Sequence, residues 1–137
     1  MHPMLNIGIQ AARGASKIIN RYLDHMDAVD VTEKSKNDVV TQVDKLAEEE
    51  IIAHIQKAYP KHSIFAEESG HIPGDDYCWI IDPLDGTRNF VHGFPQFCIS
   101  IAVKNKDQLE VGVIYDPVRQ ELFTATRGEG AQLNHRK

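Results

Sequence analysis

The chain has 137 residues and a mass of 15.4 kDa, with 42% hydrophobic and 26% charged residues, which suits one soluble domain with a buried core. Its formal net charge of −5 and sequence pI near 5.8 argue against broad electrostatic binding to nucleic acid. The sequence shows neither a signal peptide nor an apolar run of about 18 residues, so we expect a cytoplasmic protein with no membrane span.

Apolar residues at helical spacing predict two long helices in the first half of the chain. The first should run from about residue 4 to residue 27, and the second from its N-cap at Thr41 to Tyr59-Pro60. Between them, residues 29–34 and 38–41 predict a hairpin on either side of the polar, solvated stretch Lys34-Ser35-Lys36-Asn37. In the second helix, the positions expected to face the core are Val43, Leu46, Ala47, Ile51, Ile55 and Ala58, and those expected to face solvent are Glu48, Glu49 and Lys57.

From residue 61 onward, short apolar runs between turn residues predict strands. The expected strands are 63–66 and 77–81, separated by a turn-rich segment at 70–76, then an antiparallel meander of 97–103, 109–115 and 121–125. A short helix is expected at 87–91, and residues 131–134 could begin a further strand with an unpaired edge. Helices followed by strands predict an α+β or layered α/β class.

Two aspartates, Asp82 and Asp85, directly follow the apolar strand at 79–81. Pro83 helps the chain bend so that both carboxylates converge, and unit like charges about 4 Å apart repel by roughly 4 kcal/mol at an effective dielectric constant of 20. A divalent cation would reverse that repulsion, and oxygen ligands without clustered Cys or His favour Mg²⁺ over zinc. Gly86-Thr87 stands where the short helix begins, a suitable place for a phosphate. The alternative is an ordinary Asx turn with an N-cap.

Two further acidic segments lie earlier in the chain. Glu67 and Glu68 follow the strand at 63–66, so they should emerge at the same end of the sheet as Asp82, although such a pair alone would usually be only solvated. Asp44 by itself is an acid in the first turn of a helix, where the helix dipole stabilises it. A lysine or arginine filling the space between these carboxylates would argue against a cation site.

Together these motifs resemble the inositol monophosphatase family, including its bacterial SuhB-type members. The matching stretches are Asp38-Val-Val-Thr-x-x-Asp44, Glu67-Glu68-Ser69, Trp79-Ile-Ile-Asp-Pro-Leu-Asp-Gly-Thr-x-Asn-Phe90 and Gly128-Glu-Gly-Ala131. The resemblance implies the layered α-β-α-β-α sandwich of the sugar phosphatases. Residues 1–137 would be its amino-terminal metal-binding α+β domain, with the first helices and the larger antiparallel sheet, and the carboxyl-terminal α/β part would be absent.

The resemblance also implies a role for each matching position, with two or three Mg²⁺ ions as cofactors. Asp82 would bridge two ions, Glu67 would face a third, and Thr87 paired with Asp44 would orient and help deprotonate the attacking water. The implied metal ligands are Glu67, Asp82, Asp85 and the backbone carbonyl of Leu84; the implied catalytic residues are Asp44, Glu67, Glu68 and Thr87; and the implied substrate-binding residues are Leu84, Asp85, Gly86 and Thr87.

The implied activity is Mg²⁺-dependent hydrolysis of inositol monophosphate, a small phosphomonoester, to inositol and inorganic phosphate by a metal-activated water, with inhibition by lithium. Fructose bisphosphatases and bisphosphate nucleotidases share part of the pattern, but Thr87-x-Asn-Phe90 and Glu67-Glu68-Ser69 favour the inositol branch. Arg88 stands where many relatives carry threonine, and we interpret it as a surface change.

Two readings from other classes stay open. SuhB-type relatives act with RNA polymerase in transcription antitermination, so the resemblance also permits a regulatory protein. Family members continue past this length to a Trp-Asp motif that supplies a further metal ligand, so a third reading is an inactive fragment that binds Mg²⁺ weakly and turns over little substrate. Relatives are generally homodimers, and we expect the same here.

Overall fold

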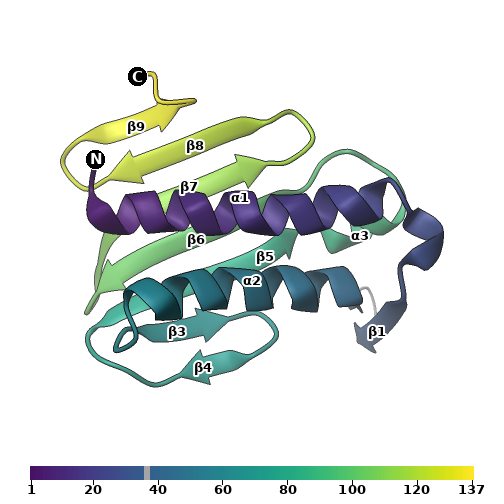
Figure 1. The fold of residues 1–137 in the computed structure, drawn as a ribbon, viewed down its shortest axis with the longest axis horizontal. Helices are drawn as coiled ribbons and strands as arrows, with labels where there is room; N and C mark the ends of the chain where they lie inside the picture. The colour runs from purple at the N-terminus through teal and green to yellow at the C-terminus, as the bar shows by residue number, and fades with distance from the viewer. Residues whose placement is uncertain (36–37) are drawn as a thin grey trace.

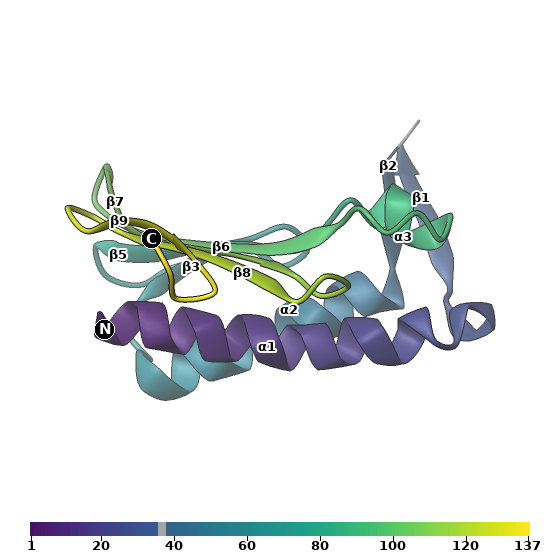
Figure 2. The same cartoon turned by 90° about the horizontal axis from the view of Figure 1, so that it is seen from above.

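Two long helices, α1 (Pro3–Leu23) and α2 (Gln42–Ala58), lie side by side on one face of a seven-stranded sheet (Figures 1 and 2). The computed structural model describes residues 1–35 and 38–137. The first helix ends earlier than predicted, at Leu23, and a short 3₁₀ turn, η1 (Met26–Ala28), follows it. Within the described ranges, no helix combines the length and the apolar character that crossing a membrane requires.

The large sheet has the strand order β4-β3-β5-β6-β7-β8-β9. Every neighbouring pair is antiparallel except β3 and β5, which run parallel. The predicted meander is confirmed, and the fold class is α+β. The strands are β3 (Ser63–Ala66), β4 (Gly70–Ile72), β5 (Tyr77–Asp85), β6 (Cys98–Asn105), β7 (Gln108–Asp116), β8 (Glu121–Thr126) and β9 (Gly130–Leu133).

Two parts of the sheet differ from the prediction. The segment expected to be only turn contains β4, which pairs with β3 through a tight loop that Gly70 closes with a φ of +71°. This backbone conformation favours glycine. Gly70 therefore serves both as the turn residue and as the first residue of β4. β5 continues past Ile81 to Asp85, and its pairing with β6 is irregular between Asp82 and Asp85 because Pro83 has no N–H for the ladder.

A separate two-stranded hairpin links η1 to α2. Its strands, β1 (Val31–Ser35) and β2 (Asp38–Thr41), pair antiparallel as predicted. The predicted polar connection at Lys36-Asn37 lies outside the described residues. Figure 2 shows the hairpin standing next to the short helix α3 (Thr87–Val91), whose bounds match the prediction. The hairpin and α3 thus meet near the start of α2.

Burial alternates along the strands, and one face of the sheet packs against the two helices (Figure 2). Trp79 is the largest side chain of this core, and it is fully buried. On the opposite face, which none of the described elements covers, large apolar side chains are exposed: Phe65, Ile80, Ile114, Phe123 and Leu133. The helical layer therefore lies on one side only.

The burial of α2 corrects three predictions. Glu48, expected to face solvent, is only 1% exposed, whereas Leu46 and Ala58, expected in the core, are exposed. The helix lies with the face that bears Asp44 and Glu48 toward loops at the end of the sheet, where hydrogen-bond donors meet these carboxylates. Apolar periodicity alone therefore misplaces the solvent-facing side of α2.

Candidate active site

All eight site residues predicted from the sequence line one pocket of about 230 Å³. Parallel pairing of β3 and β5 explains why two of the motifs meet. Ala66, the last residue of β3, lies opposite Ile81 in β5, so the residues that follow, Glu67 and Asp82, lie at the same end of this strand pair. The lining residues are Lys34, Asp44, Glu67, Glu68, Asp82, Leu84, Asp85, Gly86, Thr87 and Arg88.

Gly86 turns the chain from β5 into α3. It is the N-cap of that helix and has a φ of +100°, a conformation that side chains disfavour. A Cβ atom here would lie 2.8 Å from the Gln96 carbonyl oxygen, which is too close. The glycine therefore allows Thr87 to start α3 directly beside the Asp82–Asp85 segment.

Asp44 connects the start of α2 to α3. It is 3% exposed, and its Oδ2 accepts hydrogen bonds from Thr41 N–H at 2.9 Å and from Thr41 Oγ1 at 2.6 Å. Thr41 is the N-cap of α2, as predicted, and forms a capping box with Asp44. The other carboxylate oxygen, Oδ1, accepts from Thr87 Oγ1 at 2.7 Å. Asp44 is therefore held on one side and directed at Thr87 on the other.

The single hydroxyl proton of Thr87 has two acceptors within reach. The Asp44 carboxylate is 2.7 Å away and the Leu84 carbonyl oxygen is 3.0 Å away. A hydrogen bond to a carboxylate is stronger than one to a neutral carbonyl, so the proton lies toward Asp44. The lone pairs of Thr87 Oγ1 are then available as acceptors for a group in the pocket.

Electrostatics in the pocket are dominated by carboxylates. Burial, followed by the negative charges of Asp85 and Glu67, raises the pKa of Asp82 to about 6, and a hydrogen bond from the Leu84 N–H opposes this rise. Burial, followed by the negative charges of Asp85 and Asp82, raises the pKa of the neighbouring Cys98 thiol to about 11. This thiol therefore stays protonated near neutral pH and is not a nucleophile.

Two basic residues also line the pocket, Lys34 and Arg88. The sequence predicts that Lys34 is only solvated, and this prediction is wrong. Its Nζ forms an ion pair with the Glu68 carboxylate at 2.8 Å. The second lysine of that stretch, Lys36, lies outside the described residues. Five carboxylates against two cationic side chains leave an excess of negative charge around Asp82.

The donor set suits a hard cation. Its charged oxygens come from Glu67, Asp82 and Asp85, with the Leu84 carbonyl nearby, and oxygen donors of this kind are preferred by Mg²⁺. Within residues 1–35 and 38–137, no group of three His, Cys, Asp or Glu side chains is already close enough to hold an ion. A cation between the carboxylates would offset their mutual repulsion.

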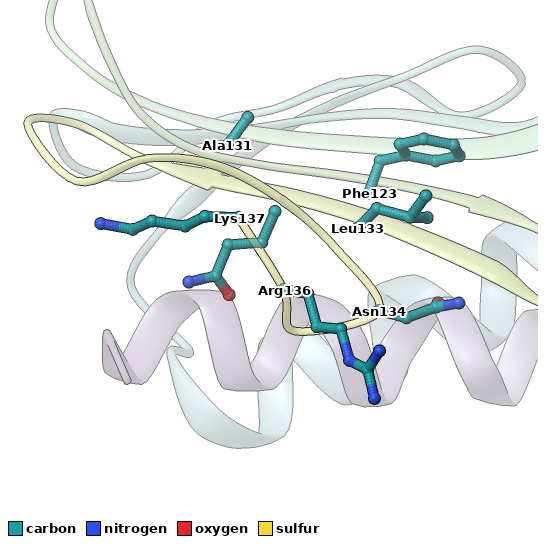
Figure 3. Close-up of a pocket in the computed structure, with 7 residues that line it drawn as sticks. Phe123, Ala131, Leu133, Asn134, Arg136 and Lys137 are labelled. Atoms are coloured by element: carbon teal, nitrogen blue, oxygen red, sulfur yellow. The ribbon is translucent and has the colours of Figure 1, made fainter.

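A larger hollow, of about 740 Å³, lies at the other edge of the sheet (Figure 3). It is lined by Phe123, Ala131, Gln132, Leu133, Asn134, Arg136 and Lys137, which include no carboxylate. Strands β6 and β7 separate β8 and β9 from β5, so this hollow is distinct from the acidic pocket. Charge and convergent polar groups, rather than size, identify the acidic pocket as the candidate site.

Sequence reasoning missed that Lys34 and Arg88 line the pocket, and it also missed Glu48, which lies behind it. The Glu48 carboxylate accepts hydrogen bonds from the backbone of Glu68 and from both the backbone and the hydroxyl of Ser69. One signal was present in the sequence, because Glu48 follows Asp44 by four residues and therefore shares its helix face. The structure thus adds a buried carboxylate directly behind the pocket.

Known proteins resemble this chain in sequence and in fold. The model of the inositol monophosphatase family matches residues 1–137. The Nus factor SuhB of Haemophilus influenzae is 58% identical over 136 residues, which cover 98% of this chain and 51% of that protein. The crystal structure of the extragenic suppressor protein SuhB from Bartonella henselae superposes with a TM-score of 0.95 at 42% identity, covering 98% of this chain and 53% of that one.

A third relative is a solved IMPase/NADP phosphatase complexed with Mg²⁺ and phosphate. It is 30% identical, with a TM-score of 0.77, and the match covers 88% of this chain and 48% of that one. The chain spans about half the length of the curated relatives it matches. Its helices and mostly antiparallel sheet match the amino-terminal half of the fold of these phosphatases. The chain therefore belongs to the inositol monophosphatase family.

Proposed function

We propose that the protein hydrolyses a phosphomonoester, with Mg²⁺ held by Glu67, Asp82 and Asp85. The observation that carries this proposal is the meeting of these three carboxylates, from two adjacent strand ends, in one pocket with Thr87. When bound, Mg²⁺ would lower the pKa of a water and neutralise the charge of the phosphate. Residues 1–137 would form the metal-binding α+β domain of such an enzyme.

For the remaining site residues we propose the roles that the family resemblance implies, with support from the contacts of Thr87 and Glu68. Thr87 Oγ1 accepts a proton from the attacking water and passes its own to Asp44 Oδ1, 2.7 Å away. The Gly86-Thr87 turn, at the start of α3, receives the phosphate together with Leu84 and Asp85. Glu68 does not bind the metal in this scheme, because its carboxylate is paired with Lys34.

For the substrate we propose inositol monophosphate. The intact protein should release inorganic phosphate from it only with Mg²⁺, and EDTA should lower the rate, because the carboxylates repel one another and the phosphate when no cation is bound. Lithium should also lower the rate, as the family resemblance implies. A colorimetric phosphate assay over inositol monophosphate, fructose 1,6-bisphosphate and an adenosine bisphosphate would rank the three superfamily substrates. Equal rates with Mg²⁺ and with EDTA would contradict the proposal.

A second candidate is a role as a Nus factor. The name "Nus factor SuhB", carried by relatives 54–58% identical, supports this role better than it supports inositol monophosphate hydrolysis as the main function. In this role the protein would act with RNA polymerase in transcription antitermination. We expect antibody capture of RNA polymerase from cells to recover the unaltered protein and its Asp82→Asn variant equally. If only the Asp82→Asn variant were not recovered, binding to RNA polymerase would depend on the metal site.

Two further properties remain predictions, one drawn from the sequence and one from the family resemblance. The protein would function in the cytoplasm, and it would form a homodimer. Analytical ultracentrifugation of the intact protein measures the second property directly.

A further inference from the structure

Glu48 is a buried carboxylate that the proposed chemistry does not use. It belongs to α2, and its side chain is 1% exposed. Its Oε1 accepts from the Glu68 N–H at 2.8 Å, while Oε2 accepts from the Ser69 N–H at 2.8 Å and from Ser69 Oγ at 2.6 Å. A buried carboxylate is unfavourable unless donors compensate for lost water, and these three donors do so.

The donors belong to the loop that carries Glu67. This loop, Glu67-Glu68-Ser69, joins β3 to β4, and the Glu67 N–H bonds to the Ile81 carbonyl of β5 at 3.3 Å. The next two N–H groups point instead to Glu48. The backbone around Glu67 is therefore held by the sheet on one side and by α2 on the other.

One face of α2 thus positions two parts of the pocket, the start of α3 and the loop after β3. Asp44 and Glu48 are four residues apart and both buried on α2. Asp44 holds Thr87 at the start of α3, and Glu48 holds the loop after β3. An apolar side chain at position 48 would fill the same space but would leave both loop N–H groups unpaired.

We propose that Glu48 is a positioning residue that holds the Glu67-Glu68-Ser69 loop so that the Glu67 carboxylate faces Asp82. The inference rests on the proposed function, since Mg²⁺ is the ligand that Glu67 would bind. A carboxylate can hold this loop because both of its oxygens accept hydrogen bonds from the loop donors. A glutamine would turn an NH₂ group toward one of the loop donors.

The test compares Glu48→Gln with Glu49→Gln, a change in the adjacent, exposed glutamate of the same helix. We expect Glu48→Gln to weaken Mg²⁺ binding by roughly 10- to 100-fold, as is typical for residues that orient metal ligands. Glu49→Gln should leave it unchanged. Mg²⁺ affinity is measured by isothermal titration at a temperature at which circular dichroism shows that each variant is folded. This choice separates weaker binding from a loss of stability. Saturating Mg²⁺ should restore phosphate release by Glu48→Gln.

Amide hydrogen exchange supplies a readout that needs no metal. Exchange at Glu68 and Ser69 should speed up in Glu48→Gln and stay unchanged in Glu49→Gln. If Glu48→Gln does not fold, Ser69→Ala, which removes one donor, carries the test with a smaller effect in the same direction. Unchanged Mg²⁺ affinity in the folded variant would overturn the inference and leave the proposed function standing. If the unaltered protein binds no Mg²⁺, the proposed function fails, and the exchange rates still decide whether Glu48 orders the loop.

Discussion

Replacing Asp82 by asparagine should weaken Mg²⁺ binding by roughly 1000-fold and abolish measurable phosphate release. Asp82 lies centrally in the acidic pocket, where the charges of Asp85 and Glu67 both act on it. Two opposite unit charges about 4 Å apart attract by roughly 4 kcal/mol at an effective dielectric constant of 20. Losing an attraction of this size between the Asp82 carboxylate and the cation corresponds to a change in affinity of roughly 1000-fold. Isothermal titration and the phosphate assay measure the two effects.

The stability of the same variant provides an internal check. Without Mg²⁺, Asp82→Asn removes a half-buried charge that two neighbouring carboxylates repel, so the midpoint of thermal unfolding should not fall. Asp107→Asn, an exposed change in the turn between β6 and β7, is the matched control and should alter neither binding nor turnover. Activity retained by Asp82→Asn would exclude Asp82 as a metal ligand.

The meeting of the acidic motifs could be predicted because it depends on local features. Glu67 and Asp82 each follow an apolar run, and the parallel pairing of β3 with β5 places them at the same end of the two strands. The capping of α2 by Thr41 and the bounds of α3 likewise follow from short-range sequence signals. Elements defined by neighbouring residues were therefore accessible from the sequence.

The environment of the charged side chains could not be predicted in the same way. The apolar periodicity of α2 predicts that Glu48 faces solvent, but its hydrogen-bond donors lie on the loop at Glu68 and Ser69, far along the chain. Lys34 was assigned to a solvated stretch, and it pairs with Glu68. Such contacts depend on how α2 and the β1–β2 hairpin dock on the sheet, which no local pattern specifies.

Replacing Thr87 by valine should lower the rate of phosphate release by roughly 100- to 10,000-fold, the range expected when a group that transfers a proton is lost. Valine has nearly the same shape but no hydroxyl, so Asp44 loses the hydrogen bond of 2.7 Å that links it to the pocket. Mg²⁺ affinity should remain close to that of the unaltered protein, because Thr87 carries no charge. Asp82→Asn, in contrast, should lose both Mg²⁺ affinity and phosphate release.

A double-mutant cycle tests whether Thr87 and Asp44 act as one unit. If the proton passes from Thr87 Oγ1 to Asp44 Oδ1, either Thr87→Val or Asp44→Asn interrupts the same path. The double variant should then be about as slow as the slower single variant, because the second change has nothing further to remove. Thr126→Val on β8, away from the acidic pocket, is the control and should leave the rate unchanged. Fully additive losses would mean that the two residues contribute independently, and Asp44 would then act only through the capping of α2.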